Sequence, residues 1–334
     1  MKRIGKFTLE TENNPSIISY ASIAGKKEAK GPLGSLFDQT ISDSYLGEKT
    51  WEKAESMLQN QAINIALCKA NLNKDDINMV FAGDLLNQCI SSTFGLRDLD
   101  IPFLGQYGAC STMAQTLLIA AIVVDCGAAS KAVAVTSSHF CTAERQFRLP
   151  LEYGGQRTPT AQWTATASGS AIVGKGGKVK IKSMCVGKII DLGVKDAANM
   201  GAAMAPAAAS TIYEFFKDTN TKPENFDCIF TGDLGEIGSK LLYEILFKNG
   251  INLKPNHKDC GLMLFAEKEQ DVHAGASGCG CSASVLCSYI LKELEKGNLK
   301  KVLFCATGAL MSPTSSQQGE SIPSICHLVE LVST

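Results

Sequence analysis

The sequence predicts an α/β fold in which one unit of strands and helices is used twice, giving five layers in the order helix, sheet, helix, sheet, helix. Two observations support this. The tripeptide Gly-Asp-Leu at 83–85 recurs at 232–234, and the Cys-Ser pair that begins at Cys110 recurs at Cys281. Each copy also carries a helix-length apolar segment, which is typical of a helix packed between sheets. Two such units predict a pseudo-two-fold axis, with a pocket where the halves meet.

The first half is expected to contain a β-rich strand, an amphipathic helix, an apolar strand, an apolar helix and another apolar strand. These elements are predicted, in that order, at 16–25, 51–72, 77–83, 111–128 and 131–138. The amphipathic helix places one set of apolar residues on a single face, namely Ala54, Leu58, Ala62, Ile65 and Ala66. The uninterrupted apolar strands are typical of strands covered on both faces, and alternation with helices predicts parallel sheets.

The second half repeats this order. Its elements are predicted at 178–187, 205–218, 227–232, 282–297 and 300–309. The Gly-rich segment 174–178 reads as a turn between the halves. We therefore divide the chain into an N-terminal half, 1–175, and a C-terminal half, 176–334.

Composition excludes several classes of protein. The chain has 334 residues, of which 45% are hydrophobic and 19% charged, and its net charge is −1. This suits a large core and argues against a nucleic-acid-binding or anionic-membrane-binding surface. The polar N-terminus lacks the apolar core of a signal peptide, and Gln115 and Asp125 interrupt the longest apolar run. We expect an intracellular protein without a signal peptide or transmembrane segment.

Thirteen cysteines are scattered along the chain. Without a signal peptide they indicate a reducing compartment, and most are expected to be small buried apolar residues. The pair Cys279 and Cys281 does not have the spacing of a zinc site, and no metal site is predicted.

Cys110 lies where a Gly-containing loop becomes the apolar helix. The positive end of a helix dipole and nearby N–H groups favour a thiolate, so this position predicts a lowered pKa and a nucleophile. The N–H groups of Ser111 and Thr112 could also hold an oxyanion or a carboxylate. The alternative is that Cys110 only packs.

The segments AGDLLNQ (82–88) and IPFLGQYGACSTMAQ (101–115) resemble the thiolase superfamily. The segment AQWTATASGSAIVGKG (161–176) is similar to the Gly-rich strand region late in the first half of ketoacyl synthase III. The resemblance runs from about Ile17 to the end of the chain. It implies a thiolase-like fold and puts Cys110 at the position of the nucleophile.

The same resemblance does not supply the usual catalytic partners. Gly232 stands where ketoacyl synthase III has its histidine, and Cys279 stands where it has its asparagine. His273, in HAGASG, is one residue out of register with the thiolase motif. Condensation needs such groups to activate the thioester, so we expect a thiolase-like binding protein and not an enzyme. The alternative is an acyltransferase or condensing enzyme that uses Cys110 with His139 or His273 as base.

Within the superfamily, the segments 153–169, 275–284 and 306–327 resemble a family of stage V sporulation proteins. This resemblance implies non-enzymatic binding of dipicolinic acid (pyridine-2,6-dicarboxylate), alone or with calcium, in support of its uptake into the developing spore. It implies the other SpoVA membrane proteins as partners and a location at the periphery of the spore inner membrane. A homodimer is a further expectation, because thiolase relatives commonly dimerise.

A flat aromatic dianion needs an apolar slot for its ring and donors for two carboxylates. The N–H groups of Ser111 and Thr112, beside Cys110, are candidates for one carboxylate. Gln156 and Arg157 are candidates for the other, with a surface charge as the alternative reading of Arg157.

Further candidates follow predicted strands or the second glycine-rich turn. Asp84 and Asp233 follow covered strands, where they could take calcium or cap loops through backbone N–H groups. His139 ends the strand after the Cys110 helix and is expected either at the pocket or as a structural histidine. Cys279 completes the set of ligand-binding candidates.

The remaining polar segments are expected at the surface. The turn-rich segment 312–324 is predicted to lie over the pocket mouth, and His257 and His327 are predicted to lie in solvated loops.

Overall fold

The same strand order occurs in each half of the chain. The computed structural model describes residues 1–147 and 157–334. The main strands of the first half are β3 (Ser16–Ala24), β5 (Met79–Gly83), β6 (Phe103–Gly105), β7 (Ala132–Ser138) and β9 (Ala167–Gly174). Those of the second half are β10 (Val179–Cys185), β11 (Cys228–Thr231), β12 (His257–Asp259), β14 (Lys301–Ala309) and β15 (Ser324–Ser333). The first set is ordered β6-β5-β7-β9-β3 and the second β12-β11-β14-β15-β10, so the two sheets match strand for strand.

The two sheets are joined along one edge. Strands β3 and β10 pair through Ile17 with Val179 and Ser16 with Lys180. The predicted boundary at residue 175 falls in the turn between β9 and β10. Hydrogen bonds therefore run continuously from one half to the other.

The sheets are mixed, and the prediction of parallel sheets is wrong for one strand of each. Strand β9 runs antiparallel to both β7 and β3, and β15 runs antiparallel to both β14 and β10. The reason lies in the connections. After β7 and after β14 the chain returns to its sheet without the crossover that a parallel neighbour requires.

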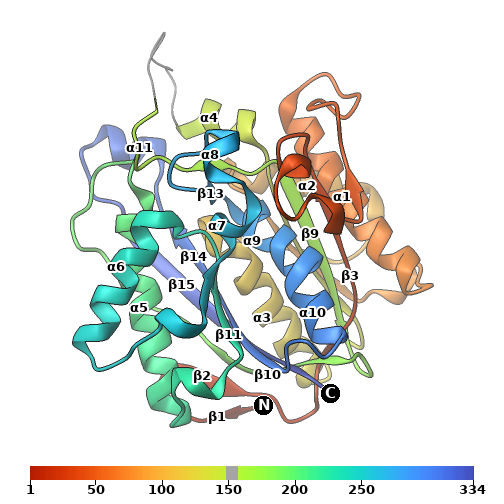
Figure 1. Cartoon of the computed structure of the whole chain (residues 1–334). Helices are drawn as coiled ribbons and strands as arrows, with labels where there is room; N and C mark the ends of the chain where they lie inside the picture. The colour runs from red at the N-terminus through yellow and green to blue at the C-terminus, as the bar shows by residue number, and fades with distance from the viewer. Residues whose placement is uncertain (148–156) are drawn as a thin grey trace.

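Two apolar helices lie between the sheets, as predicted. Helix α3 (Thr112–Asp125) contacts β5 and β7 of the first half and β14 and β15 of the second. Helix α9 (Cys279–Val285) continues through a π-helical turn (Leu286–Ile290) into α10 (Leu291–Glu295). Helices α3 and α9 contact each other, and Figure 1 shows both in the middle of the molecule.

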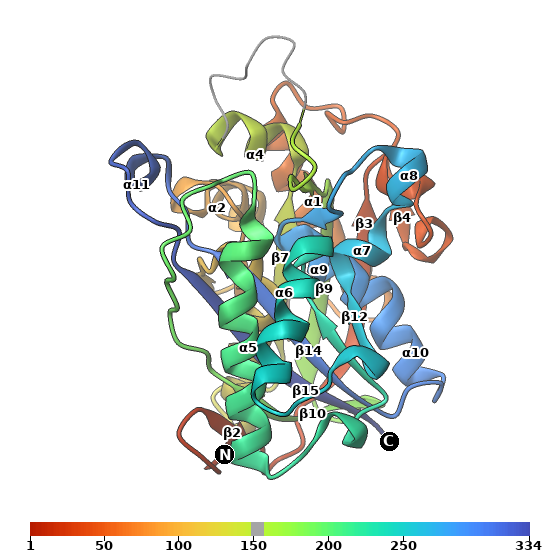
Figure 2. The ribbon, with the colours of Figure 1, turned by 60° about the vertical axis from the view of Figure 1, so that its left-hand side comes forward.

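Other helices cover the outer faces. Helix α1 (Trp51–Lys69) packs on β3, β7 and β9, and α5 (Met200–Thr219) packs on β14 and β15. Figures 1 and 2 show α5 beside α6 (Gly235–Lys248), away from α1. The predicted five layers and the duplicated α/β fold are thus confirmed. The sequence reasoning did not predict α6 or the last strand, β15.

Short elements complete the chain. They are β1 (Lys2–Arg3), β2 (Thr8–Glu10), β4 (Gln39–Thr40), α2 (Ile90–Leu96), α4 (Phe140–Phe147), β8 (Trp163–Thr164), α7 (Cys260–Leu264), α8 (Glu267–Gln270), β13 (Ala276–Ser277) and α11 (Pro313–Gln317). Strands β8 and β13 pair as a separate two-stranded sheet that joins the halves near the start of α9.

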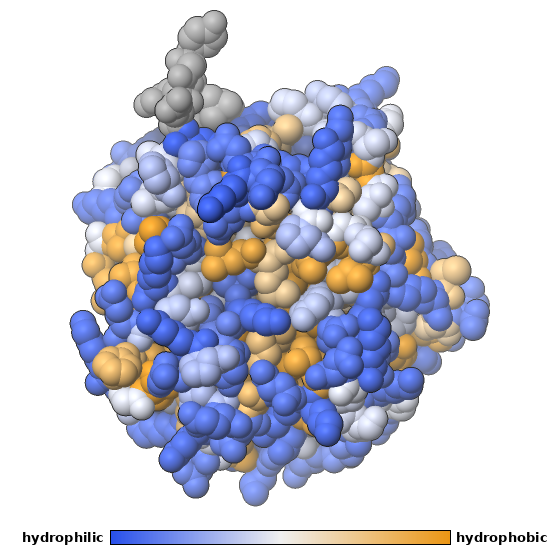
Figure 3. All heavy atoms as spheres, in the orientation of Figure 1, coloured by the Kyte–Doolittle hydropathy of each residue, from blue (hydrophilic) through white to orange (hydrophobic). Residues whose placement is uncertain are grey.

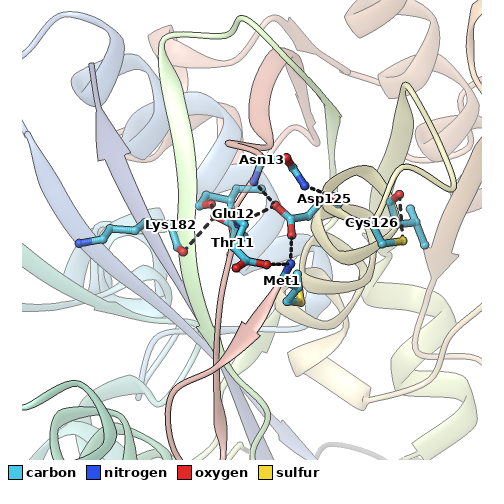
Figure 4. A network of polar contacts seen from close by, with 9 residues as sticks. Met1, Thr11, Glu12, Asn13, Asp125, Cys126 and Lys182 are labelled. Carbon is cyan, nitrogen blue, oxygen red and sulfur yellow. Dashed lines mark hydrogen bonds and ion pairs between the residues drawn. The ribbon is translucent and has the colours of Figure 1, made fainter.

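The C-terminal end of α3 is fixed by a polar network around Asp125 (Figure 4). The buried carboxylate of Asp125 accepts the N–H groups of Glu12 at 2.9 Å and Asn13 at 2.7 Å, and it lies 2.9 Å from the α-amino group of Met1. A carboxylate at a helix C-terminus is opposed by the helix dipole. These donors offset that cost and tie the first residues of the chain to the inner helix.

Two expectations from composition bear on the interior. All thirteen cysteines are free and ten are buried, as predicted for small apolar residues. Within residues 1–147 and 157–334, none of the helices has the length and apolar character needed to cross a membrane.

Candidate functional site

Cys110 lies in a tight turn that a strand of the other half holds in place. The 3₁₀ turn Ala109–Ser111 leads into α3, and Ala109 has a φ of 50°, a left-handed conformation that is strained for a residue with a side chain. Gly308 of β14 packs directly on this turn. A Cβ atom at Gly308 would lie 2.1 Å from the carbonyl oxygen of Gly108. Only glycine allows this approach, so the second half supports the turn that presents Cys110.

The N–H groups at the start of α3 already have partners. Ser111 donates its N–H to the carbonyl of Gly108 at 3.0 Å, and Thr112 donates its N–H to the carbonyl of Ala109. The two hydroxyls donate to the same two carbonyls, each at 2.6 Å. A ligand carboxylate would have to compete with these bonds for the donors that the sequence suggested.

The thiol of Cys110 contacts the carboxyl group of Asp233, which follows β11 of the second half. Asp233 is fully buried and accepts the N–H of Gly278 at 2.9 Å and the hydroxyl of Thr307 at 3.0 Å. Burial raises the pKa of Asp233 to about 7, although these donors oppose the rise.

The predicted Cys110 thiolate is wrong. Burial, followed by the neighbouring Asp233 carboxyl, raises the pKa of the Cys110 thiol well above its ordinary value. Desolvation and a nearby acid therefore outweigh the helix dipole, and Cys110 is a neutral thiol at physiological pH.

Cys279 begins α9 and meets Cys110 across the junction of the halves. Its thiol donates to the carbonyl of Ser137 at 2.9 Å, and its own carbonyl accepts the hydroxyl of Thr136 at 3.0 Å. Cys110, Cys279, Leu85 and Ala143 form one small buried cluster. The position that the resemblance associates with asparagine thus carries a second buried thiol beside the first.

Asp84 caps the loop after β5. Its carboxylate accepts the N–H of Leu86 at 2.9 Å, and the N–H and hydroxyl of Ser92 at 2.8 and 2.6 Å. These are the contacts of the loop-capping alternative and not those of a calcium ligand. Among residues 1–147 and 157–334, no group of three or more His, Cys, Asp or Glu side chains could hold a metal ion.

Glu55 of α1 is a buried acid that the sequence reasoning missed. It accepts the hydroxyls of Ser137 at 3.1 Å and Thr142 at 2.6 Å. Burial raises the pKa of Glu55 to about 8, and the nearby Asp84 carboxyl adds to this. The sequence did contain a signal for this buried acid. Glu55 and Gln59 are four residues apart on the predicted helix, beside its apolar face.

A narrow hollow lies over Cys110, at the junction that the sequence predicted. Its volume is about 30 Å³, enough for a water molecule or two. Leu85, Ala143 and Phe147 of the first half face Met200 and Met311 of the second across it. Met311 directly precedes the segment 312–324, but no residue of that segment lines the hollow, so its place over the pocket mouth stays a prediction.

The two histidines proposed as bases for the enzymatic alternative do not line this hollow. His139 is buried elsewhere, where its Nε2 donates to the carbonyl of Ser44 at 2.9 Å and its Nδ1 accepts the N–H of Cys141 at 3.2 Å. His273 lies 3.5 Å from Asp271. His139 is thus a neutral histidine with both ring nitrogens hydrogen-bonded. This matches the second of the two roles expected from the sequence, that of a structural histidine.

The remaining predicted residues lie apart from Cys110 or outside the described part of the chain. Arg157 bonds Glu144 at 3.3 Å and the carbonyl of Gln162, and its guanidinium lies over the ring of Trp163. Gln156 lies outside the described residues.

His257 and His327 are not in solvated loops. They lie in β12 and β15, where burial lowers the pKa of each to about 4. Both histidines are therefore neutral at physiological pH, with His327 buried and His257 half-buried.

Comparison with known proteins places the chain in a family. The family model described as Stage V sporulation protein AD (SpoVAD) matches residues 5–332. The Stage V sporulation protein AD of Bacillus subtilis (strain 168) is 49% identical over 328 residues, covering 98% of this chain and 97% of that protein. This chain belongs to the SpoVAD family. Membership supports a role in sporulation.

The fold of this SpoVAD family member is shared with condensing enzymes. The 3-oxoacyl-[acyl-carrier-protein] synthase III of Aquifex aeolicus VF5 superposes with a TM-score of 0.58 at 14% identity, covering 95% of this chain and 99% of that one. The cerulenin-bound OleA of Xanthomonas campestris gives a TM-score of 0.60 at 14% identity, covering 97% of this chain and 98% of that one. At these identities the likeness shows the fold alone, and it confirms the predicted thiolase-like architecture.

Proposed function

We propose that this SpoVAD family protein binds dipicolinic acid in the Cys110 hollow without covalent chemistry. The observation that supports non-covalent binding best is the neutral Cys110 thiol, raised in pKa by burial and by Asp233. Gly232 and Cys279 stand where a condensing enzyme would use histidine and asparagine, and no histidine of the described residues lines the hollow. The choice of ligand rests on the sporulation family.

The proposed ligand matches the chemistry of the hollow walls. Leu85, Phe147 and Met311 offer an apolar slot for a flat ring. A dianion would be repelled by an ionised Asp233. With a pKa of about 7, however, that carboxyl can be protonated, which removes the repulsion; it contacts the Cys110 thiol but does not itself line the hollow. Calcium bound together with the ligand is the other way to offset the repulsion between the dianion and an ionised Asp233. Entry requires the side chains of Phe147 and Met311 to move apart, because the hollow now holds only about 30 Å³.

Calorimetric titration with dipicolinate, with and without calcium, tests the proposal. We expect saturable heat that is weakened by Cys110→Ala and abolished by Ala143→Leu, which fills the hollow. Cys68→Ala, at an exposed cysteine, is the matched control. Absence of saturable heat, or full binding by both hollow variants, would refute the site.

The acyltransferase alternative is favoured by one observation, the strained turn that presents Cys110 in a condensing-enzyme fold. Mass spectrometry after incubation with acyl-CoA distinguishes the two functions. An acyl adduct on Cys110 would support the enzyme, and an unmodified mass would support binding alone.

The proposed partners are the SpoVA membrane proteins, at the periphery of the spore inner membrane. A homodimer is proposed through the edge strand β6, whose Phe103 and Leu104 are exposed beside Phe94 of α2. Sedimentation analysis of Leu104→Lys would then show a monomer where the wild type shows a dimer.

A further inference from the structure

A second hollow lies on the other side of β8 from Cys110. Its volume is about 290 Å³, near the lower end of the range for small-molecule sites and far larger than that of the Cys110 hollow. Thr164 of β8 faces Cys110, whereas its neighbour Trp163 faces the second hollow. We call this second site the lysine hollow, after Lys26, Lys27 and Lys30, which line it.

The three lysines form no ion pair within the described part of the chain, although the acids Asp271 and Glu28 lie near Lys27. The chain nevertheless carries nearly equal numbers of acidic and basic residues. Lys27 is partly withdrawn from water, with its Nζ 3.6 Å from the centroid of the Trp163 ring. Burial accordingly lowers the pKa of Lys27, with Asp271 and Glu28 opposing the change. A bound anion would supply the missing counter-charge.

One side of the hollow is apolar, whereas Asp43, Ser44 and His139 line another part of it. Trp163 stacks on Phe140 with ring centroids 4.0 Å apart, and Ile41 and Leu46 complete this side of the hollow. Because Phe140 covers one face of Trp163 and Lys27 the other, a ligand would meet ring edges and aliphatic groups. Such walls suit a ligand with an apolar body.

The acidic groups of the hollow are already occupied. Glu28 is buried at the floor and accepts the N–H of Thr166 at 2.9 Å. Asp43, at the rim, accepts the N–H groups of Tyr45 and Gly47, each at 3.0 Å. Neither carboxyl forms an ion pair with the three lysines within the described residues. The top of the face drawn in Figure 3, around α8, is dominated by hydrophilic side chains.

We propose that the lysine hollow is a second binding site, for a small carboxylate with an aromatic or aliphatic body. The carboxylate would lie among Lys26, Lys27 and Lys30, and the body against Ile41, Leu46 and the edge of the aromatic pair. This site is separate from the Cys110 hollow and does not depend on the function proposed for it.

Trp163 is a built-in reporter, because the chain has only two tryptophans. In a Trp51→Phe background its emission follows titration with benzoate, dipicolinate or inorganic phosphate. We expect a saturable change with the two carboxylates as the ammonium of Lys27 turns from the ring to the ligand. Lys27→Gln should raise the ligand concentration at the midpoint about tenfold, because one charge-assisted contact is lost. Lys248→Gln, an exposed lysine outside the hollow, is the matched control.

Two further variants separate this site from the other hollow. The double variant Lys26→Gln/Lys30→Gln leaves the Lys27–Trp163 contact in place. It should also raise the ligand concentration at the midpoint. Ala143→Leu should leave the Trp163 signal unchanged while abolishing heat from the Cys110 hollow. A Trp163 signal lost in Ala143→Leu would overturn the proposal, as would no signal with either carboxylate or equal midpoints for Lys27→Gln and Lys248→Gln. Equal affinity for phosphate and benzoate would overturn the requirement for an apolar body.

Discussion

Replacing Asp233 by asparagine should change stability in a way that depends on pH. The carboxyl is fully buried, accepts bonds from Gly278 and Thr307, and contacts the thiol of Cys110. Asparagine has the same shape but stays neutral at every pH. It removes the cost of a buried charge and gives up one acceptor, since its amide nitrogen can only donate.

The magnitude follows from the pKa. Burial raises the pKa of Asp233 from 3.8 to about 7, and each pKa unit corresponds to about 1.4 kcal/mol. The folded state holds the proton more tightly, so stability falls as pH rises from about 4 to about 7 and is level above. By this reasoning the raised pKa costs about 4 kcal/mol of stability at pH 8, where the folded carboxyl is ionised, and about 2 kcal/mol less than that at pH 5, where the folded carboxyl is protonated. The lost acceptor costs about 1–2 kcal/mol at both.

We therefore expect Asp233→Asn to be near neutral at pH 5 and stabilising by about 2–3 kcal/mol at pH 8. Urea denaturation at the two pH values, followed by circular dichroism, measures the difference. Asp43→Asn is the control, because two backbone donors hold the pKa of the exposed Asp43 below its usual range and it is ionised at both pH values. Equal effects of Asp233→Asn at pH 5 and pH 8 would refute the reasoning.

Three further predictions concern the Cys110 turn, the Asp125 network and the thiols. Gly308→Ala should destabilise the protein by about 3 kcal/mol in urea denaturation, because its Cβ would lie 2.1 Å from the Gly108 oxygen; wild-type stability would contradict the close approach. Asp125→Asn should cost about 1–3 kcal/mol at pH 7, since it removes the charge that pairs with the α-amino group of Met1 at 2.9 Å, although its amide oxygen can still accept the two N–H groups. Burial opposes ionisation of Asp125, but its hydrogen bonds prevail and lower its pKa, so that cost should shrink in acid, and an unchanged cost at pH 2 would argue against it. Iodoacetamide at pH 8 should label the exposed Cys68 and Cys126 before the buried Cys110 and Cys279, as peptide mass mapping can measure; early labelling of Cys110 would restore the thiolate interpretation.

The parts of the fold that sequence reasoning recovered are those set by local pattern. The apolar helix predicted at 111–128 is Thr112–Asp125, and the amphipathic helix predicted at 51–72 is Trp51–Lys69. Strand direction was beyond that reasoning, because β9 runs antiparallel through the path of its connection and not through its own residues. Local sequence pattern is enough to predict a helix or strand, but not to predict which strand it pairs with or in which direction.

The site shows the same division more sharply. The position of Cys110 at a helix start could be inferred, because it depends on adjacent residues. Its protonation could not, because the deciding carboxyl, Asp233, belongs to the other half of the chain. His139 likewise follows β7 as predicted, but whether its ring reaches Cys110 depends on the loop at Ser44 that accepts its proton.

The contact between Gly308 and the Cys110 turn also orders events during synthesis. The turn belongs to the first half, yet the strand that buttresses it, β14, leaves the ribosome near the end of translation. Until then nothing on β14 can hold Ala109 in its left-handed conformation, and such long-range contacts form slowly. The Cys110 turn is therefore completed late, and we expect truncated chains that end before β14 to lack the binding proposed for Cys110.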